Sequence, residues 1–223
     1  VANTELWNGT NWTEQNDLNT ARGKGGGAGT TTNALAFGGE DSSPGVTAAT
    51  EEWTGAGAPV GAWSTGGSLN TARWELSGAG VSNSAALAFG GDTSPGPNTA
   101  ATESYNGTSW TEVNDLNQAR KQAGGAGTYT SALATGGSID TGYIALNEAW
   151  NGSSWTEEAD LNTARALGAM GGASSESALF FGGGPGSGTT GATESWNGSA
   201  WTEVNDLNSS RRQLSGAGTA TSA

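Results

Sequence analysis

The chain repeats one short motif five times, and this repetition limits its fold more than any other feature. The motif is an aromatic residue, Asn-Gly, two further residues and Trp; four copies are close, and the copy from Trp53 to Trp63 is stretched. The four close copies begin at Trp7, Tyr105, Trp150 and Trp196. Each copy is followed by an acidic and polar stretch and then by an arginine, and these arginines are 51, 47, 45 and 46 residues apart. A period of this size is typical of propeller blades, whereas helical solenoid repeats have about 33 or 34 residues.

Each repeat predicts four strands. A run of glycine and alanine, such as Gly124-Gly125-Ala126-Gly127, comes first, and glycine within a strand indicates close approach of backbones. An apolar run closed by a glycine doublet, such as Leu87-Ala88-Phe89-Gly90-Gly91, is typical of a buried strand. An alternating run then ends in the first aromatic residue, Asn-Gly predicts a two-residue type I′ turn, and Trp-Thr-Glu-Val predicts the last strand.

The sequence therefore predicts an all-β fold, with residues 1–223 as a single domain. We expect a five-bladed β-propeller of four-stranded antiparallel blades, built from five repeats of 45–52 residues, because small inner side chains fit a narrow ring. The N- and C-terminal strands would share one blade and close the ring. That blade is one strand short, so we expect the native polypeptide to continue past Ala223 with a Leu-Ala-Phe-Gly-Gly-like strand, or a partner segment to insert.

The order of glycine doublet, aromatic residue, Trp and Arg resembles the kelch repeat, and the resemblance covers all five copies. It implies a β-propeller. Two features depart from the kelch pattern: the spacing from the aromatic residue to Trp is five in four copies, shorter than in kelch repeats, and the prolines before the arginine are missing. The identical strings Trp110–Asn117 and Trp201–Asn208 indicate recent amplification of the repeat.

The charge and composition exclude several kinds of site. The net charge is −13, and five of the eight basic residues occupy the repeated arginine position, which argues against nucleic acid and anionic membranes as partners. No apolar run is long enough to span a bilayer, so we expect no membrane insertion. The chain has no Cys and no His, which excludes disulfides, Cys or His zinc sites, Cys nucleophiles and His-based triads.

The repeated arginines have two interpretations. They could form a ring that binds anions, or each could pair with a repeated glutamate and hold neighbouring blades together. A charge that recurs in every blade favours the second interpretation, because paired charges are the usual way to bury Arg. The predicted structural residues are Arg22, Arg73, Arg120, Arg165, Arg211, Glu5, Glu51, Glu103, Glu148 and Glu194.

The aromatic and carboxylate repeats also favour structural roles. The Trp pairs could stack on sugars, but aromatic residues present in every blade favour sheet packing. Carboxylate pairs recur after the last strand, as in Glu112/Asp115, whereas glycoside hydrolysis needs one unique pair in a cleft. Calcium would fit such carboxylates, yet no Asp-x-Asp-x-Asp-Gly loop is present. We expect no catalytic residues, no metal and no cofactor.

Binding residues are expected where the repeats differ. Trp74 alone among the ten tryptophans lies outside the repeated positions. The loops after the glycine doublets, residues 40–47, 92–99, 138–143 and 184–191, differ most between copies, and variable loops on a rigid scaffold often carry binding function. They should emerge on the same face as the linkers that end in arginine. The candidate ligand-binding residues are Trp74, Glu40, Asp41, Asp92, Asp140 and Tyr143.

The most direct functional prediction is a non-enzymatic binding or structural module on a virion, an appendage or a cell exterior. Its richness in Thr, Ser, Asn and Gly, with few lysines, is similar to phage fibre, decoration and bacterial adhesin proteins. The expected partner is a protein or a glycan of a host or cell surface, and the chain is expected to be part of a larger chain or assembly. The alternatives are a glycan-binding lectin and, after it, an enzyme that acts on glycosides.

Overall fold

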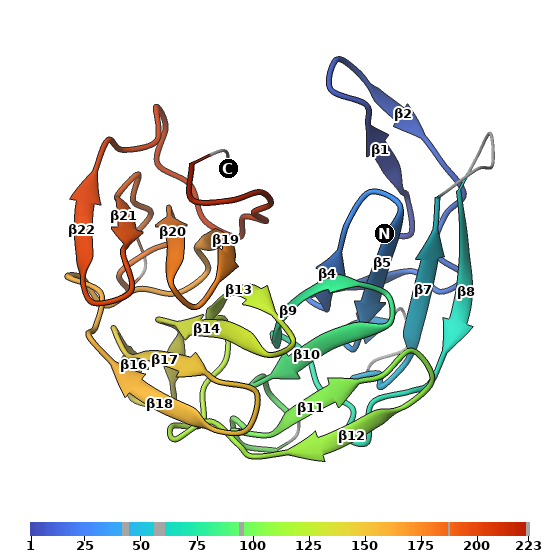
Figure 1. Cartoon of the computed structure of the whole chain (residues 1–223), viewed down its shortest axis with the longest axis horizontal. Coiled ribbons are helices and arrows are strands. Elements are labelled where there is room, and N and C mark those ends of the chain that lie inside the picture. Colours follow the sequence, from blue (N-terminus) through green and yellow to red (C-terminus); the bar gives the residue numbers. More distant parts are fainter. Residues whose placement is uncertain (42–44, 56–60, 94–95, 187, 222–223) are drawn as a thin grey trace.

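The chain consists of antiparallel sheets that follow one another along an arc (Figure 1). The computed structural model describes residues 1–41, 45–55, 61–93, 96–186 and 188–221. Within these ranges it contains 22 strands and no helix, and every strand pair is antiparallel. The prediction of an all-β fold is therefore confirmed.

Four of the sheets have four strands each, and each is built from one repeat. Within a sheet the strands lie in chain order, so each strand pairs with the strand that precedes it and the strand that follows it. The first two sheets are β4 (Gly26–Gly29), β5 (Asn33–Phe37), β7 (Thr50–Thr54), β8 (Ala62–Gly66), and β9 (Ser77–Ser82), β10 (Ala85–Phe89), β11 (Thr102–Tyr105), β12 (Trp110–Val113). The next two are β13 (Gly124–Thr128), β14 (Ser131–Thr135), β17 (Asn147–Trp150), β18 (Trp155–Glu158), and β19 (Ala169–Ser174), β20 (Ser177–Phe181), β21 (Thr193–Trp196), β22 (Trp201–Val204).

The glycine-rich strand of each sheet lies on the inner side of the arc and contacts its counterparts. β4 contacts β9, β9 contacts β13, and β13 contacts β19. A β-carbon on Gly78 would lie 2.9 Å from the carbonyl oxygen of Gly27, and one on Gly125 would lie 2.5 Å from that of Gly78. Since such distances leave no room for a side chain, glycine is what lets the inner strands approach this closely.

The core lies between neighbouring sheets. Phe37 of β5 packs edge-on against Trp110 of β12, with ring centres 4.9 Å apart, and Phe89 of β10 packs in the same way against Trp155 of β18, at 5.0 Å. Each of these aromatic contacts joins one sheet to the next sheet in the chain. A single repeat therefore cannot bury its own apolar residues, as is general for repeat architectures.

The predicted two-residue type I′ turn at Asn-Gly is wrong. The two aromatic residues of a hairpin face each other directly, as Trp150 faces Trp155, so the loop between them has four residues. Only Gly152 has a positive φ, +94°, while the Asn151 side chain accepts hydrogen bonds from the backbone N–H groups of Ser153 (2.9 Å) and Ser154 (3.0 Å). Asn is needed here for its side-chain oxygen, which closes the loop, rather than for its tolerance of positive φ.

The two ends of the arc are less complete than its middle. β1 (Glu5–Trp7) and β2 (Trp12–Glu14) form a separate hairpin, which the Trp63 indole joins to the first large sheet by donating to the Thr4 hydroxyl at 2.9 Å. Residues 213–219 run beside the inner strand β19, where the N–H of Gln213 donates to the carbonyl of Leu167 at 2.8 Å. Among the described residues, no strand pairing joins the hairpin to these C-terminal residues. The closed ring of five blades remains a prediction.

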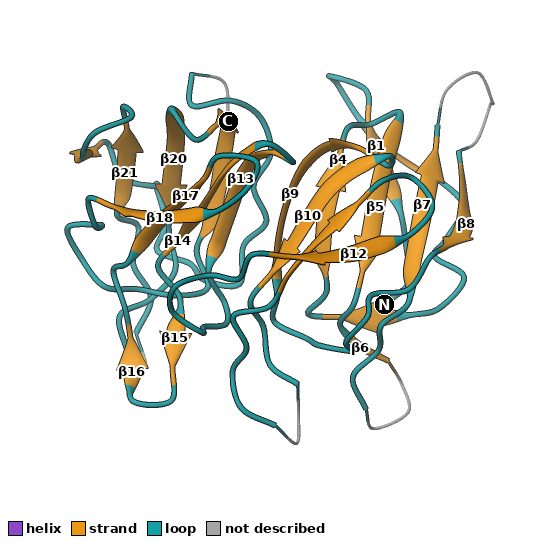
Figure 2. Ribbon diagram, turned by 60° about the horizontal axis from the view of Figure 1, so that its bottom comes forward, coloured by secondary structure: helices purple, strands orange, loops and turns teal. Residues whose placement is uncertain are grey.

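Two short sheets stand apart from the large ones. They extend from the end of the molecule at which the loops after the glycine doublets emerge (Figure 2). They consist of β3 (Arg22–Gly23) with β6 (Glu40–Asp41), and of β15 (Ser138–Ile139) with β16 (Gly142–Tyr143). We call this end of the molecule the loop face.

Candidate functional site

Four of the five repeated arginines are buried, and each pairs with the repeated glutamate of the following sheet. The Arg73 guanidinium also donates to the backbone carbonyls of Ala101 (2.6 Å) and Ala88 (3.3 Å), so one side chain ties the linker to two strands of that sheet. Burial lowers the pKa of Arg73, and the carboxylate of Glu103 opposes this effect. The pairs are Arg22–Glu51, Arg73–Glu103 (3.0 Å), Arg120–Glu148 (2.8 Å) and Arg165–Glu194 (2.5 Å).

Each buried glutamate has a second partner that the sequence analysis missed. The backbone N–H and the side-chain amide of Asn70 both donate to the second carboxylate oxygen of Glu103, at 2.7 and 2.8 Å. Asn19, Asn117 and Asn162 do the same in the other copies. The signal was present in the sequence, because an Asn stands three residues before every repeated arginine.

The fifth arginine and the fifth glutamate are placed differently. Arg211 and Glu5 are both exposed, and within the described residues neither forms an ion pair. Arg211 lies near the C-terminal end of the chain and Glu5 in the N-terminal hairpin. These are the two ends of the arc.

A belt of backbone hydrogen bonds connects the copies on the loop-face side of the inner strands. It runs through five equivalent residues, all with φ between 53° and 60°, which is uncommon for residues other than glycine. From the second of these residues on, each N–H donates to the carbonyl of the equivalent residue in the preceding copy, at 2.8, 2.9, 3.1 and 2.8 Å. These residues surround a cavity of about 310 Å³. We call them the axial belt: Lys24, Glu75, Gln122, Leu167 and Gln213.

Trp74 lies beside the axial belt, between the two lysines of the chain. The Nζ of Lys24 is 4.0 Å from the centre of the Trp74 ring, and that of Lys121 is 5.8 Å from it. Cation–π contacts of this kind attract each lysine to the ring. The Trp74 indole N–H is buried without a hydrogen-bond partner in the described part of the chain. Both lysines therefore lie against the Trp74 ring, while the described residues leave its polar atom unsatisfied.

Carboxylates surround these lysines. The Nζ of Lys121 is 2.8 Å from Asp92 and 3.6 Å from Glu75, and the Nζ of Lys24 is 3.3 Å from Glu40. Burial lowers the pKa of Lys121, but the hydrogen bond and charge of Asp92, followed by Glu75, outweigh it and raise that pKa. We call Lys24, Glu40, Trp74, Glu75, Asp92 and Lys121 the Trp74 cluster.

The remaining predicted ligand residues adjoin this cluster or lie near it. Asp140 accepts a hydrogen bond from the Asn98 side chain at 3.1 Å, and Asn98 is bridged to Asp92. Tyr143 pairs with Ser138, which is bridged to Lys121. Asp41 lies opposite Arg22 in the register of the short sheet of β3 and β6. The six predicted residues thus lie along the loop face of three successive sheets.

Sequence reasoning missed the two lysines as members of this site. The signal was available, because they are the only lysines in an acidic chain and they follow Arg22 and Arg120 closely. Parts of the predicted binding loops, residues 42–44, 94–95 and 187, lie outside the described residues. The same holds for residues 56–60 of the stretched repeat and for 222–223.

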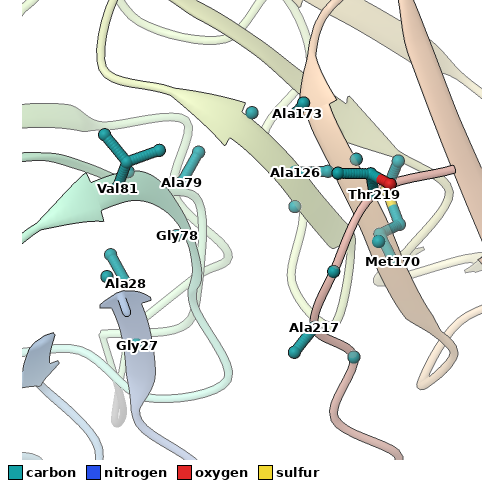
Figure 3. A pocket seen from close by; sticks show the side chains of 18 of the residues that line it. Gly27, Ala28, Gly78, Ala79, Val81, Ala126, Met170, Ala173, Ala217 and Thr219 are labelled. Atoms are coloured by element: carbon teal, nitrogen blue, oxygen red, sulfur yellow. The ribbon is translucent and has the colours of Figure 1, made fainter. Parts of the chain in front are cut away.

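A second hollow lies along the inner strands (Figure 3). It measures about 480 Å³, and its lining is almost entirely Gly and Ala, with Val81, Met170 and the hydroxyls of Ser215 and Thr219. Among the described residues, its walls carry no carboxylate, amine or guanidinium. They therefore lack the paired titratable groups that acid–base catalysis needs.

The repeated carboxylates after the last strands have structural contacts. Asp115 accepts the backbone N–H of Thr102 at 3.1 Å, and Asp160 and Asp206 accept the N–H groups of Asn147 and Thr193, both at 3.3 Å. In the described ranges, no group of three or more carboxylates could hold a metal ion. The described residues contain no helix with the length and hydrophobicity needed to cross a membrane.

No protein-family model matches this chain. No curated protein matches it either.

Proposed function

We propose that the chain is a five-bladed, kelch-like β-propeller whose fifth blade combines the hairpin β1–β2 with residues 213–219. The buried pairs support this, because each arginine pairs with the glutamate of the next copy, and Arg211 followed by Glu5 continues that order around a ring. The axial belt supports it independently. Its last link would run from the N–H of Lys24 to the carbonyl of Gln213.

A double-mutant cycle tests this ring closure. Arg211→Ala and Glu5→Ala are made singly and together, and Arg120→Ala with Glu148→Ala provides the matched control in the middle of the arc. In a closed ring both cycles give coupling free energies of about 0.5–3 kcal/mol, as groups in direct contact do. A coupling of zero for Arg211 and Glu5, beside a clear coupling for the control, would contradict closure.

We further propose that this propeller is a non-enzymatic recognition module exposed on a virion, an appendage or a cell exterior. One observation carries the proposal: the only Trp outside the repeats and both lysines of an acidic chain gather on the loop face. Around them are carboxylates at 2.8–3.6 Å, and the buried indole N–H has no partner among the described residues. Tryptophan is among the residues that contribute most binding energy at protein interfaces, and the rim around such an anchor is polar.

The two lysines make this proposal testable, because amine-reactive reagents modify only them and the terminal amine. In the native assembly, Lys24 and Lys121 should acetylate more slowly than in the isolated chain. Trp74→Gly, which introduces the residue of the equivalent position 23, should weaken assembly binding. Tyr129→Ala, which removes an exposed aromatic ring from the turn between β13 and β14, should not. Equal acetylation in both states would contradict the proposal.

The lectin alternative predicts a different result. A glycan array should then give a signal that Trp74→Gly abolishes and Tyr129→Ala leaves unchanged. The close approach of Lys24 to the Trp74 ring covers surface that a sugar would need for stacking, so we rank this alternative second.

A further inference from the structure

The aromatic pair of the N-terminal hairpin is exposed, although the equivalent residues elsewhere are buried, apart from Trp63, which is half-buried. The exposed fractions are 44% for Trp7 and 64% for Trp12, against 2% and 5% for Trp150 and Trp155. The two rings still face each other, with centres 5.5 Å apart. The hairpin has therefore formed, but the surface that should cover it is absent from the described residues.

The complete sheets show what covers such a pair. In each of them the strand before the aromatic hairpin places an alanine opposite the first aromatic residue, as Ala86 faces Tyr105 and Ala132 faces Trp150. The next residue of that covering strand is always a leucine: Leu35, Leu87, Leu133 and Leu179.

The end of the covering strand has equally specific contacts. Its glycine doublet donates a backbone N–H to the repeated arginine that follows the sheet, as Gly91 donates to the carbonyl of Arg120 at 2.9 Å. The residue before the doublet can be an aromatic that packs on the Trp of the next sheet, as Phe37 does on Trp110. Each contact of the covering strand therefore has a defined partner.

All the partner groups for such a strand are present at β1. Within the described residues β1 pairs only with β2, so its other edge is unpaired. Trp63 of the next sheet is half-buried and lacks the ring that Phe37 and Phe89 provide for the tryptophans of the second and third large sheets. The carbonyl of Arg22 accepts a long hydrogen bond, 3.4 Å, from the Val1 amine.

We propose that the free edge of β1 is a docking site for one extended segment of a partner polypeptide with the pattern small-Leu-small-aromatic-Gly-Gly. The small residue lies opposite Trp7, the leucine opposite Leu6, and the aromatic residue on Trp63; the second glycine donates to Arg22. Main-chain hydrogen bonds along β1 provide affinity, and the alternate side chains provide specificity. The inference rests on the proposed fifth blade, in which this segment is the missing second strand.

The test uses a labelled peptide with the sequence of residues 84–92, Ser-Ala-Ala-Leu-Ala-Phe-Gly-Gly-Asp. It should bind the 223-residue chain with one peptide per chain, raise the fluorescence anisotropy of the label and slow amide exchange of Glu5–Trp7. The same peptide carrying Leu87→Pro should bind at least ten-fold more weakly, because proline cannot donate to the strand ladder. In the protein, Trp7→Ala should weaken binding by a similar factor, and the control Tyr129→Ala should not.

Several outcomes would overturn the proposal. These are no binding, equal binding of the proline peptide, or unchanged exchange at β1 when the peptide binds. Dimerisation of the chain that protects β1 without peptide would assign the edge to a second copy. Slow exchange at β1 only when the peptide is fused after Ala223 would assign it to the same polypeptide.

Peptide binding without coupling of Arg211 to Glu5 would leave the docking site intact and count against ring closure alone.

Discussion

The hairpin of β17 and β18 and the hairpin of β1 and β2 carry nearly the same motif in different surroundings. In both, two tryptophans face each other, with ring centres 5.4 and 5.5 Å apart, and an Asn side chain closes the turn. Yet Trp150 is buried while Trp7 is 44% exposed. The same motif therefore forms the same hairpin in both surroundings, whereas the burial of its tryptophans depends on the strands and sheets around it.

The largest expected effect is the loss of a buried tryptophan. Trp150→Ala should lower the free energy of unfolding by about 3–5 kcal/mol, the usual cost of removing a large buried aromatic side chain. Trp7→Ala should cost less than about 1 kcal/mol, because its covering strand is absent from the described residues. Urea unfolding measures both. Equal losses would mean that Trp7 is covered in solution and would remove the contrast between the two hairpins.

The next effect concerns the buried charges. Arg120→Ala should lower stability by about 3 kcal/mol, at the lower end of the range for broken buried pairs, because Asn117 still donates to Glu148. Arg212→Ala changes an exposed arginine beside the C-terminal segment and should cost less than about 0.5 kcal/mol. Thermal unfolding of the two variants checks this. A loss within error for Arg120→Ala would show that the pair does not hold the sheets together.

A smaller effect should be the same in both hairpins. Asn151→Ala and Asn8→Ala each remove an acceptor for two backbone N–H groups of a four-residue turn. Each change should lower the opening free energy of its own hairpin by about 1 kcal/mol. Hydrogen exchange of the strand amides in each hairpin measures this. Unequal losses would mean that the turn, too, depends on its surroundings.

The smallest effect depends on pH. Tyr105 takes the position of Trp7 in the second sheet and donates its hydroxyl to Glu52; burial and this hydrogen bond raise its pKa to about 12. The native pKa of Tyr105 is raised, so its protonated hydroxyl contributes to the free energy of unfolding. This contribution is complete below about pH 10, the pKa of unfolded tyrosine, and is lost as the pH rises through about 12. The difference in urea midpoint between the parent and Tyr105→Phe should therefore be constant from pH 7 to 9 and shrink above pH 10. A constant difference up to pH 12 would exclude this linkage.

Much of the fold was predictable because it depends on local patterns. The glycine doublets, the apolar runs and the Trp-Thr-Glu-Val segments mark strands that the structure contains. The type I′ turn failed because the sequence shows Asn-Gly but not the register, and the facing tryptophans set a four-residue loop in which the Asn side chain accepts the hydrogen bonds.

The candidate site was predictable only in part. Trp74 could be chosen because it breaks the repeat, and the carboxylates because they lie in variable loops. The positions of Lys24 and Lys121 around Trp74 could not be read from the sequence, because each of these three residues belongs to a different linker. The axial belt was hidden as well, because its five residues have different side chains and share only a backbone conformation.

The sequence by itself determined the repeat, the strands, the aromatic hairpins and the residue types of the buried pairs. It could do so because hydrophobic alternation, turn residues and repeated spacing act over a few residues. Only the tertiary structure decided that Glu103 serves both Arg73 and Asn70, that the lysines flank Trp74, and that Trp7 remains exposed while Trp150 is buried. Those outcomes depend on which sheet lies beside which, and packing between sheets is set by contacts between residues far apart in the chain.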